Sequence, residues 1–320
     1  MSSAFSFATA IAIILAIVEG VFGASFTFIN RCDYTVWPGI LANAGSERLD
    51  STGFELGPGG SREFHAPASW SGRIWGRTAC TFDDSTGQGS CATGDCGSNQ
   101  VECNGAGATP PATLAEFTIG SGAQDFYDVS LVDGYNLPMQ VEAVGGSGAC
   151  GSTGCAKDLN RMCPDELRAA DGQACKSACE AFGTPEYCCS GAYGSPATCK
   201  PSMYSEMFKS ACPRSYSYAY DDATSTFTCS GADYRITFCP SLTSRKSSLL
   251  PSFSTGVGGN NEDSGPQDSM FSGRSWLPGF LTGDSSRMTS QFGLHSKSPI
   301  TSAIAFFILL LIHLLQLFLL

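Results

Sequence analysis

The fold class is clearest in residues 114–134, which read LAEFTIGSGAQDFYDVSLVDG. Within this stretch, residues 114–119 and 126–132 alternate between apolar and polar side chains on either side of a Gly-containing break. Alternation with a period of two is typical of a strand that buries one face. The stretch therefore predicts two short β-strands.

Four more segments show the same pattern. They are rich in β-branched and aromatic residues and are separated by Gly, Pro, Asn and Asp: residues 25–29 (SFTFI), 34–37 (YTVW, closed by Pro38), 225–229 and 234–239. Short strands separated in this way are typical of an antiparallel sandwich or barrel. We therefore expect a mainly β fold.

The composition excludes several other classes of protein. Only 15% of the 320 residues are charged, against about 25% in a typical globular chain, which excludes a charge-rich disordered chain or a coiled coil. The 29 acidic and 18 basic residues give a net charge of −11, which argues against a nucleic-acid partner and against docking on anionic lipid by charge. Residues 24–240 contain 24 acidic and 13 basic residues, so this part carries the whole net charge.

All 16 cysteines lie between Cys32 and Cys239. An even number at this density, downstream of a secretion signal, is typical of disulfides formed in an oxidising compartment, so we expect eight of them. There is no C-x-x-C pair, and residues 24–240 contain a single histidine, His65. We therefore expect neither a metal site nor serine-hydrolase chemistry. The chain also lacks a glycine-rich phosphate loop, and we predict no cofactor.

Cysteines are densest at about residues 150–212, where two short helical signals also occur. Residues 164–167 (PDEL) resemble the start of a helix, and residues 173–182 (QACKSACEAF) precede Gly183, a residue type that commonly ends helices. A helix there would place Cys175 and Cys179 on one face. A lobe of this size buries little apolar area, so we expect the crosslinks to hold it together.

The N-terminal end and the segment after residue 240 differ from the cysteine-rich part. Residues 11–18 (IAIILAIV) have the length of a signal-peptide core. We therefore predict a signal peptide over residues 1–23, cleaved after Gly23; an uncleaved anchor is the alternative. Residues 241–284 are rich in Ser, Gly and Pro and lack both cysteine and periodicity, which predicts a flexible stalk.

The apolar tail, residues 303–320, follows a polar spacer and a run of small residues at 283–286. This order is typical of a lipid-anchor (GPI) signal whose tail is removed. We therefore interpret residues 285–320 as that signal, with attachment at Asp284 or Ser285. The alternative is a single-pass C-terminal helix.

The chain also carries a set of specific motifs: GDC at 94–96, TPPATLAEF at 109–117, DFYDVSLVDG at 125–134, NLP at 136–138, the pair Cys188-Cys189 and YRITFCP at 234–240. Together they resemble thaumatin-like proteins, the pathogenesis-related group five of plants. The resemblance spans about residues 24–240 and includes all 16 cysteines in the family's order. One local departure is Ser98-Asn99, where the family signature has a glycine; Asn tolerates the left-handed backbone of such a turn.

The resemblance implies a particular architecture. It consists of a flattened antiparallel β-sandwich, a disulfide-rich lobe at about residues 150–212 with short helices, a small third lobe, and a cleft between the first two. The resemblance also implies the eight disulfide pairings Cys32–Cys239, Cys80–Cys91, Cys96–Cys103, Cys150–Cys229, Cys155–Cys212, Cys163–Cys175, Cys179–Cys188 and Cys189–Cys199.

Family members with antifungal action carry one Arg, one Glu and three Asp along the cleft. The resemblance assigns these roles to Arg73, Glu116, Asp128, Asp133 and Asp221. The strand pattern agrees for Glu116, which lies on the strand face opposite Phe117 and can point away from an aromatic core. Asp128 and Asp133 would lie on opposite faces of a straight strand, so the chain must turn at Asp133-Gly134.

Two interpretations are open for each of three residues: Arg73, Tyr127 and Tyr135. Arg73 is the counter-charge that keeps neighbouring carboxylates ionised, or an exposed strand arginine. Tyr127 and Tyr135 are candidates for stacking against sugar rings, although aromatic residues in strands more often belong to a core.

The resemblance, together with the predicted signal peptide and lipid-anchor signal, implies a secreted, monomeric plant defence protein with an antifungal role, tethered at the outer face of the plasma membrane or in the cell wall. Its expected partner is a β-1,3-glucan of a fungal or plant cell wall, bound in the acidic cleft. The alternative is a weak endo-β-1,3-glucanase with Glu116 as the acid and Asp128 or Asp133 as its partner, since hydrolysis needs one protonated and one ionised carboxyl group. A third hypothesis, membrane permeabilisation, is disfavoured by the negative field of the domain.

Overall fold

The computed structural model describes residues 22–122 and 124–240. Apart from its last two residues, the predicted signal peptide lies outside the described residues, and so do the predicted stalk (241–284) and the predicted lipid-anchor signal (285–320), including Asp284 and Ser285. Within the described part, no helix is both long and apolar enough to cross a membrane.

The described residues form mostly short strands with a few short helices. In chain order these elements are β1 (Phe22–Asn30), β2 (Trp37–Ala42), β3 (Ser61–Pro67), β4 (Ser71–Phe82), β5 (Gly89–Thr93), β6 (Leu114–Thr118), β7 (Asp125–Ser130), β8 (Met139–Ser147), β9 (Thr153–Cys155), η1 (Asn160–Met162), η2 (Asp165–Leu167), β10 (Arg168–Ala169), η3 (Ala170–Gly172), β11 (Ala174–Cys175), α2 (Ala178–Phe182), α3 (Pro185–Cys188), η4 (Gly191–Tyr193), α4 (Met203–Ala211), α5 (Asp222–Ser225) and β12 (Phe227–Phe238).

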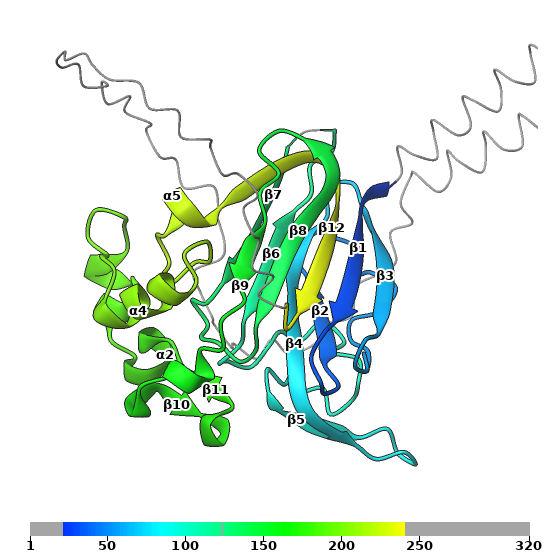
Figure 1. Cartoon of the computed structure of the whole chain (residues 1–320), viewed down its shortest axis with the longest axis horizontal. Helices are drawn as coiled ribbons and strands as arrows, with labels where there is room; N and C mark the ends of the chain where they lie inside the picture. The colour runs from blue at the N-terminus through cyan, green and yellow to red at the C-terminus, as the bar shows by residue number, and fades with distance from the viewer. Residues whose placement is uncertain (1–21, 123, 241–320) are drawn as a thin grey trace, which may run out of the picture. The chain divides into compact units, whose positions relative to one another are not determined.

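Ten of the described strands join in one sheet, in the order β2-β4-β6-β7-β12-β1-β3, with β5 paired to β4 and β8 paired to β12 and β9 (Figure 1). These strands pair antiparallel, except that β1 and β12 are parallel. The parallel pair brings the first and last strands side by side, and the Cys32–Cys239 disulfide joins the chain just after both of them. The mainly β, largely antiparallel fold is as predicted.

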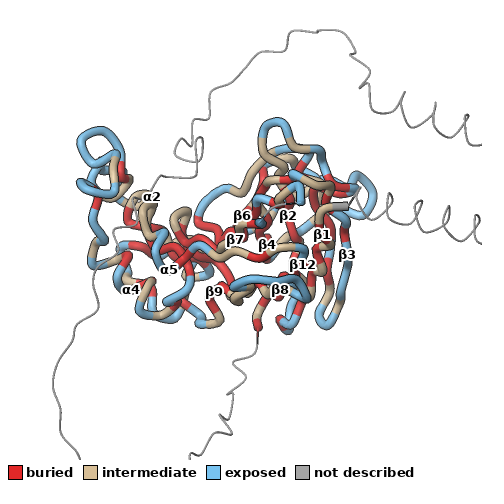
Figure 2. Tube along the Cα trace, turned by 90° about the horizontal axis from the view of Figure 1, so that it is seen from above, coloured by how far each residue is buried: buried red, intermediate tan, exposed pale blue. Residues whose placement is uncertain are grey.

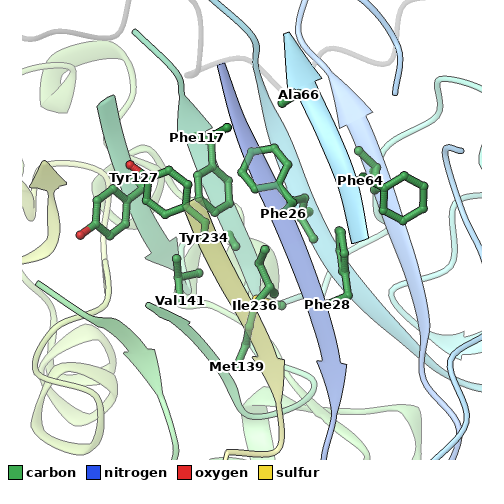
Figure 3. Packing of buried hydrophobic residues seen from close by; sticks show 14 of the residues in the cluster. Phe26, Phe28, Phe64, Ala66, Phe117, Tyr127, Met139, Val141, Tyr234 and Ile236 are labelled. Carbon is green, nitrogen blue, oxygen red and sulfur yellow. The ribbon is translucent and has the colours of Figure 1, made fainter. Parts of the chain in front are cut away.

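The sheet curls over so that its two halves share one core. In a flat sheet, β6 and β1 would be three strand spacings apart, about 14 Å at about 4.8 Å per strand. Instead, the ring centroids of Phe117 on β6 and Phe26 on β1 are 4.7 Å apart, and both rings also pack on Tyr234 of β12 (Figure 3). Burial of these rings and of the other apolar side chains of the core is the main favourable contribution to the sandwich.

Strand β12 belongs to both halves. Its first residues, Phe227–Cys229, pair with β7, whereas the residues after Gly231 pair with β8 and β1. Gly231 has φ of 65°, which a residue without a side chain adopts at little cost. Residues 227–229 and 234–238 of the two predicted strands are therefore parts of one strand, whereas Ser225, the first residue of the strand predicted at 225–229, is the last residue of the short helix α5.

The strand predicted at residues 34–37 lies further along the chain, at Trp37–Ala42. β2 begins at Trp37 and continues through Pro38, which was expected to end it. A proline has no N–H to give to a strand ladder, but β2 lies at the end of the sheet order, where this is tolerated. The Pro38 carbonyl accepts a hydrogen bond from the Phe54 N–H at 3.2 Å.

All 16 cysteines lie in the described part of the chain, and none of them is free. They form eight disulfides, and each joins the two cysteines that the resemblance pairs. Four disulfides crosslink the lobe at about residues 150–212, whose own buried cluster is small and includes Leu159, Leu167 and Phe208. Much of this lobe is exposed (Figure 2), so the disulfides, each typically worth about 2–4 kcal/mol, supply what the core does not.

The helices of this lobe differ from those predicted. Residues 164–167 contain only the 3₁₀ turn η2, and the helix predicted over 173–182 is restricted to α2, which ends at Gly183 as expected. Ala174–Cys175 forms β11, paired with β10. Cys175 and Cys179 therefore do not share a helix face, and that prediction is wrong. The longer helix α4 has no counterpart among the predicted elements.

Candidate functional site

Three polar side chains, which we call the acidic row, form a line across neighbouring strands. Arg73 on β4 lies directly opposite Glu116 on β6, and Glu116 lies directly opposite Asp128 on β7. Residues opposite each other in this way have Cβ atoms about 4.5–5.5 Å apart. The next residues along the strands, Phe117 and Tyr127, are buried in the main core. The acidic row therefore occupies the other face of the sheet, which is where the alternation placed Glu116.

Asp133 reaches the same region after a turn. The Gly134 N–H donates to the Leu131 carbonyl at 3.0 Å, and Gly134 has φ of 84°. The chain thus turns where the spacing from Asp128 required it. The Asp133 carboxyl group interacts electrostatically with Arg73 and with Glu116. We call the acidic row together with Asp133 the acidic cluster.

Burial raises the pKa of every carboxyl group in the acidic cluster. It raises the pKa of Glu116 to about 7, against the opposing effect of the Arg73 guanidinium and with a further increase from the charge of Asp133. It also raises the pKa of Asp128 well above its usual range, and repulsion from Glu116 and Asp222 adds to the effect. The pKa of Asp133 is raised by burial too, again against Arg73. The Arg73 guanidinium thus lowers the pKa values of Glu116 and Asp133, as a counter-charge does, but burial raises these pKa values by more.

One oxygen of the acidic cluster lacks a hydrogen-bond donor among the residues that the structure describes. Asp128 Oδ1 is buried and accepts no hydrogen bond from the described residues. Leaving a buried acceptor unsatisfied costs about 1–3 kcal/mol, and more if it is charged. A hydroxyl donor from a ligand would offset this cost. Within residues 22–122 and 124–240, no group of three or more His, Cys, Asp or Glu side chains is arranged to hold a metal ion.

Asp221, the fifth residue that the resemblance assigns, makes strong contacts within the protein. Its Oδ2 pairs with Lys209 Nζ of α4 at 2.9 Å and accepts from the N–H and the hydroxyl of Ser217, both at 3.0 Å. The neighbouring Asp222 is the acid that repels Asp128, and it also accepts a hydrogen bond from the Tyr216 hydroxyl at 2.8 Å. In this structure, Asp221 anchors α4 while Asp222 acts on the acidic row.

The two tyrosines considered for sugar stacking are core residues. Tyr127 is 1% exposed and Tyr135 is 0% exposed. Tyr127 donates its hydroxyl hydrogen bond to the Gly151 carbonyl, and Tyr135 donates to the Lys157 carbonyl at 2.9 Å. Neither ring presents a face to a ligand here, which corrects the stacking hypothesis in favour of its alternative.

Two residues that act on the acidic cluster were not predicted. Asp222 stands directly after Asp221 in a segment without strand or helix periodicity, so its orientation had no signal in the sequence. Glu180 lies on α2 and has its pKa raised to about 7, mainly by burial and further by the charge of Asp133, against Lys176. The surroundings of Glu180 depend on how the five-residue helix α2 packs within the protein, and no local sequence pattern predicts this packing.

The chain has clear relatives. The sequence model of the Thaumatin family matches residues 30–240. The chain is 74% identical over 227 residues to Thaumatin-like protein 1 of Arabidopsis thaliana, a match that covers 69% of this chain and 87% of that protein. It is 63% identical over 219 residues to Pathogenesis-related thaumatin-like protein 3.5 of Cryptomeria japonica (68% and 90% covered) and 58% identical over 224 residues to Pathogenesis-related protein 5 of Arabidopsis thaliana (69% and 92% covered).

The raised pKa of Glu116 predicts a specific dependence of stability on pH. Between the usual pKa of 4.5 and the folded-state pKa of about 7, the folded protein binds a proton that the unfolded chain has released. The free energy of unfolding should therefore fall as pH rises through this window, by about 1–3 kcal/mol more in the wild type than in Glu116→Gln. Urea denaturation at several pH values measures both slopes.

Glu63→Gln on β3 is the matched control, because that carboxyl group is exposed and outside the acidic cluster. It should leave the wild-type slope in place. Equal slopes for the wild type and Glu116→Gln would show that burial does not raise the pKa of Glu116.

Proposed function

Because the chain belongs to the thaumatin family, we propose that it is a secreted, monomeric defence-type protein that binds β-1,3-glucan through the acidic cluster, with an antifungal role. The observation that carries the proposal is the acidic row: one guanidinium and two carboxyl groups in register on three adjacent strands, on the face opposite the core. Rigid strands hold such groups at fixed spacing, as recognition of a repeating polymer requires.

The chemistry of these groups fits a neutral polyol. Sugar hydroxyls donate hydrogen bonds to carboxyl oxygens and accept hydrogen bonds from protonated carboxyl groups. Asp128 Oδ1 is an acceptor that lacks a donor in the described part of the chain. The guanidinium of Arg73 supplies donors for sugar oxygens. The domain's excess of acidic residues disfavours anionic polymers by repulsion.

Hydrolysis of the glucan is the second candidate, and the adjacency of Glu116 and Asp128 favours it. A carboxyl group with a pKa of about 7 stays protonated in mildly acidic solution, as the general acid of a glycosidase must. The partner must be ionised under the same conditions. Burial raises the pKa values of Asp128 and Asp133 as well. At a given pH, Glu116 is therefore protonated while its partner is ionised in only a small fraction of the molecules. This supports binding with little turnover.

For the location, we propose secretion after removal of residues 1–23 and attachment to the outer face of the plasma membrane by a lipid at Asp284 or Ser285. The eight disulfides support an oxidising compartment. The order of small residues, polar spacer and apolar tail supports the lipid anchor.

Binding of a linear β-1,3-glucan is the first test. The full chain, produced through a eukaryotic secretory pathway, should bind laminarin in isothermal titration calorimetry. The double variant Glu116→Ala, Asp128→Ala should bind at least about tenfold more weakly, because a factor of ten corresponds to about 1.4 kcal/mol and two acceptors are lost. Glu63→Ala, on the exposed β3, should bind like the wild type. A wild type that does not bind, or equal losses in both variants, would contradict the proposal.

The anchor has a separate test. A phosphatidylinositol-specific phospholipase should release the protein from the membranes of cells that express the full chain, because a lipid anchor leaves no peptide in the bilayer. Deletion of residues 303–320 should send the protein into the medium without phospholipase. Protein that stays with the membrane fraction after complete digestion would instead support the single-pass helix.

A further inference from the structure

Glu180 holds an unsatisfied acceptor on the disulfide-rich lobe. It lies in the first turn of α2, where its backbone N–H donates to the hydroxyl of the N-cap residue Ser177 at 3.2 Å. Its side chain is half-buried, and Oε2 is buried without a hydrogen-bond partner among the described residues. A carboxyl oxygen in this state lacks the donor that native structures normally supply.

The backbone brings the segment before α2 to the turn that carries Asp133. Tyr135 and Cys175 exchange two hydrogen bonds, each 2.8 Å long, from N–H to carbonyl. The approach is close at Gly134, where a Cβ atom would lie 2.7 Å from the Cys175 carbonyl oxygen. The turn that carries Asp133 therefore lies against the segment that leads into α2. The Cys163–Cys175 and Cys179–Cys188 disulfides hold that segment and α2 in place.

Two charged side chains act on Glu180. Asp133 repels it from the sheet side, and Lys176 attracts it from the segment before α2. The acids of the neighbouring η2 are occupied elsewhere: Asp165 pairs with Arg168 at 2.7 Å, and Glu166 accepts from the Tyr204 hydroxyl at 3.0 Å. On α3, Glu186 is exposed.

We propose that Glu180 is a ligand-contacting residue of the acidic cluster, so that a glucan chain is held from both lobes: by Glu116 and Asp128 on the sheet and by Glu180 Oε2 on α2. This inference rests on the proposed glucan binding. A sugar hydroxyl gives Oε2 its missing donor and removes the cost of leaving a buried acceptor unsatisfied. A second carboxyl group opposite Asp133 also adds repulsion toward acidic polysaccharides, so Glu180 contributes to specificity for neutral chains.

The experiment compares Glu180→Ala and Glu180→Gln with the wild type in the full chain. Calorimetry should show laminarin binding about tenfold weaker in Glu180→Ala. Glu180→Gln should recover most of the affinity, because its amide oxygen accepts the same hydrogen bond, and should bind an oligogalacturonide more tightly than the wild type. Glu186→Gln, which removes one exposed charge from the same lobe, should match the wild type with both ligands.

The outcomes separate this inference from the proposed function. If the wild type fails to bind laminarin, the proposed function fails and the role of Glu180 fails with it. If the wild type binds and Glu180→Ala binds equally well, glucan binding stands and the role of Glu180 is overturned. A lower thermal midpoint in Glu180→Ala, together with no recovery of affinity in Glu180→Gln, would assign Glu180 a structural role and overturn the inference too.

Discussion

The register of β6 against β4 and β7 is the constraint on which the acidic cluster depends. Side chains alternate between faces along a strand, so a slip of β6 by one residue would turn Glu116 into the core and Phe117 out of it. The packing of Phe117 on Phe26 and Tyr234, with ring centroids 4.7 Å and 5.3 Å away, resists such a slip. The aromatic core thereby fixes the line of Arg73, Glu116 and Asp128 on the opposite face. Packing on one side of the sheet determines the chemistry on the other.

The disulfide-rich lobe at about residues 150–212 is stabilised mainly by its crosslinks. Its apolar cluster is small, and four disulfides connect its turns and short helices. Crosslinks act mainly by restricting the unfolded chain, so they stabilise a lobe that buries little surface. This arrangement lets α2, only five residues long, hold Glu180 in a fixed place beside Asp133. The four carboxyl groups so gathered all have raised pKa values because burial disfavours their charged forms. Such an environment suits recognition of neutral hydroxyl groups better than a surface of fully ionised acids would.

Local sequence patterns predicted the features that depend on residues close together in the chain. The alternation in residues 114–134 located β6 and β7, placed Glu116 opposite Phe117 and required the turn at Asp133. The resemblance supplied the disulfide pairs, which no spacing rule could give. Other contacts between distant segments were predicted neither by the local patterns nor by the resemblance. Nothing local showed that residues 227–238 form one strand bent at Gly231, that β11 replaces the start of a helix, or that α4 exists. For the same reason the sequence did not separate Asp221, which pairs with Lys209, from Asp222, which acts on Asp128, or show that the charge of Asp133 acts on Glu180.

We expect the acidic face of β4, β6 and β7 to bind the glucan together with α2. Amide chemical-shift mapping of the isotope-labelled protein with a short β-1,3-linked glucose oligomer would locate the bound glucan. The predicted result is a continuous set of perturbed amides around Arg73, Glu116 and Asp128, extending to Glu180. Perturbations centred instead on the exposed edge strand β3, or on the aromatic surface of Phe182, Tyr187 and Tyr204, would contradict the claim.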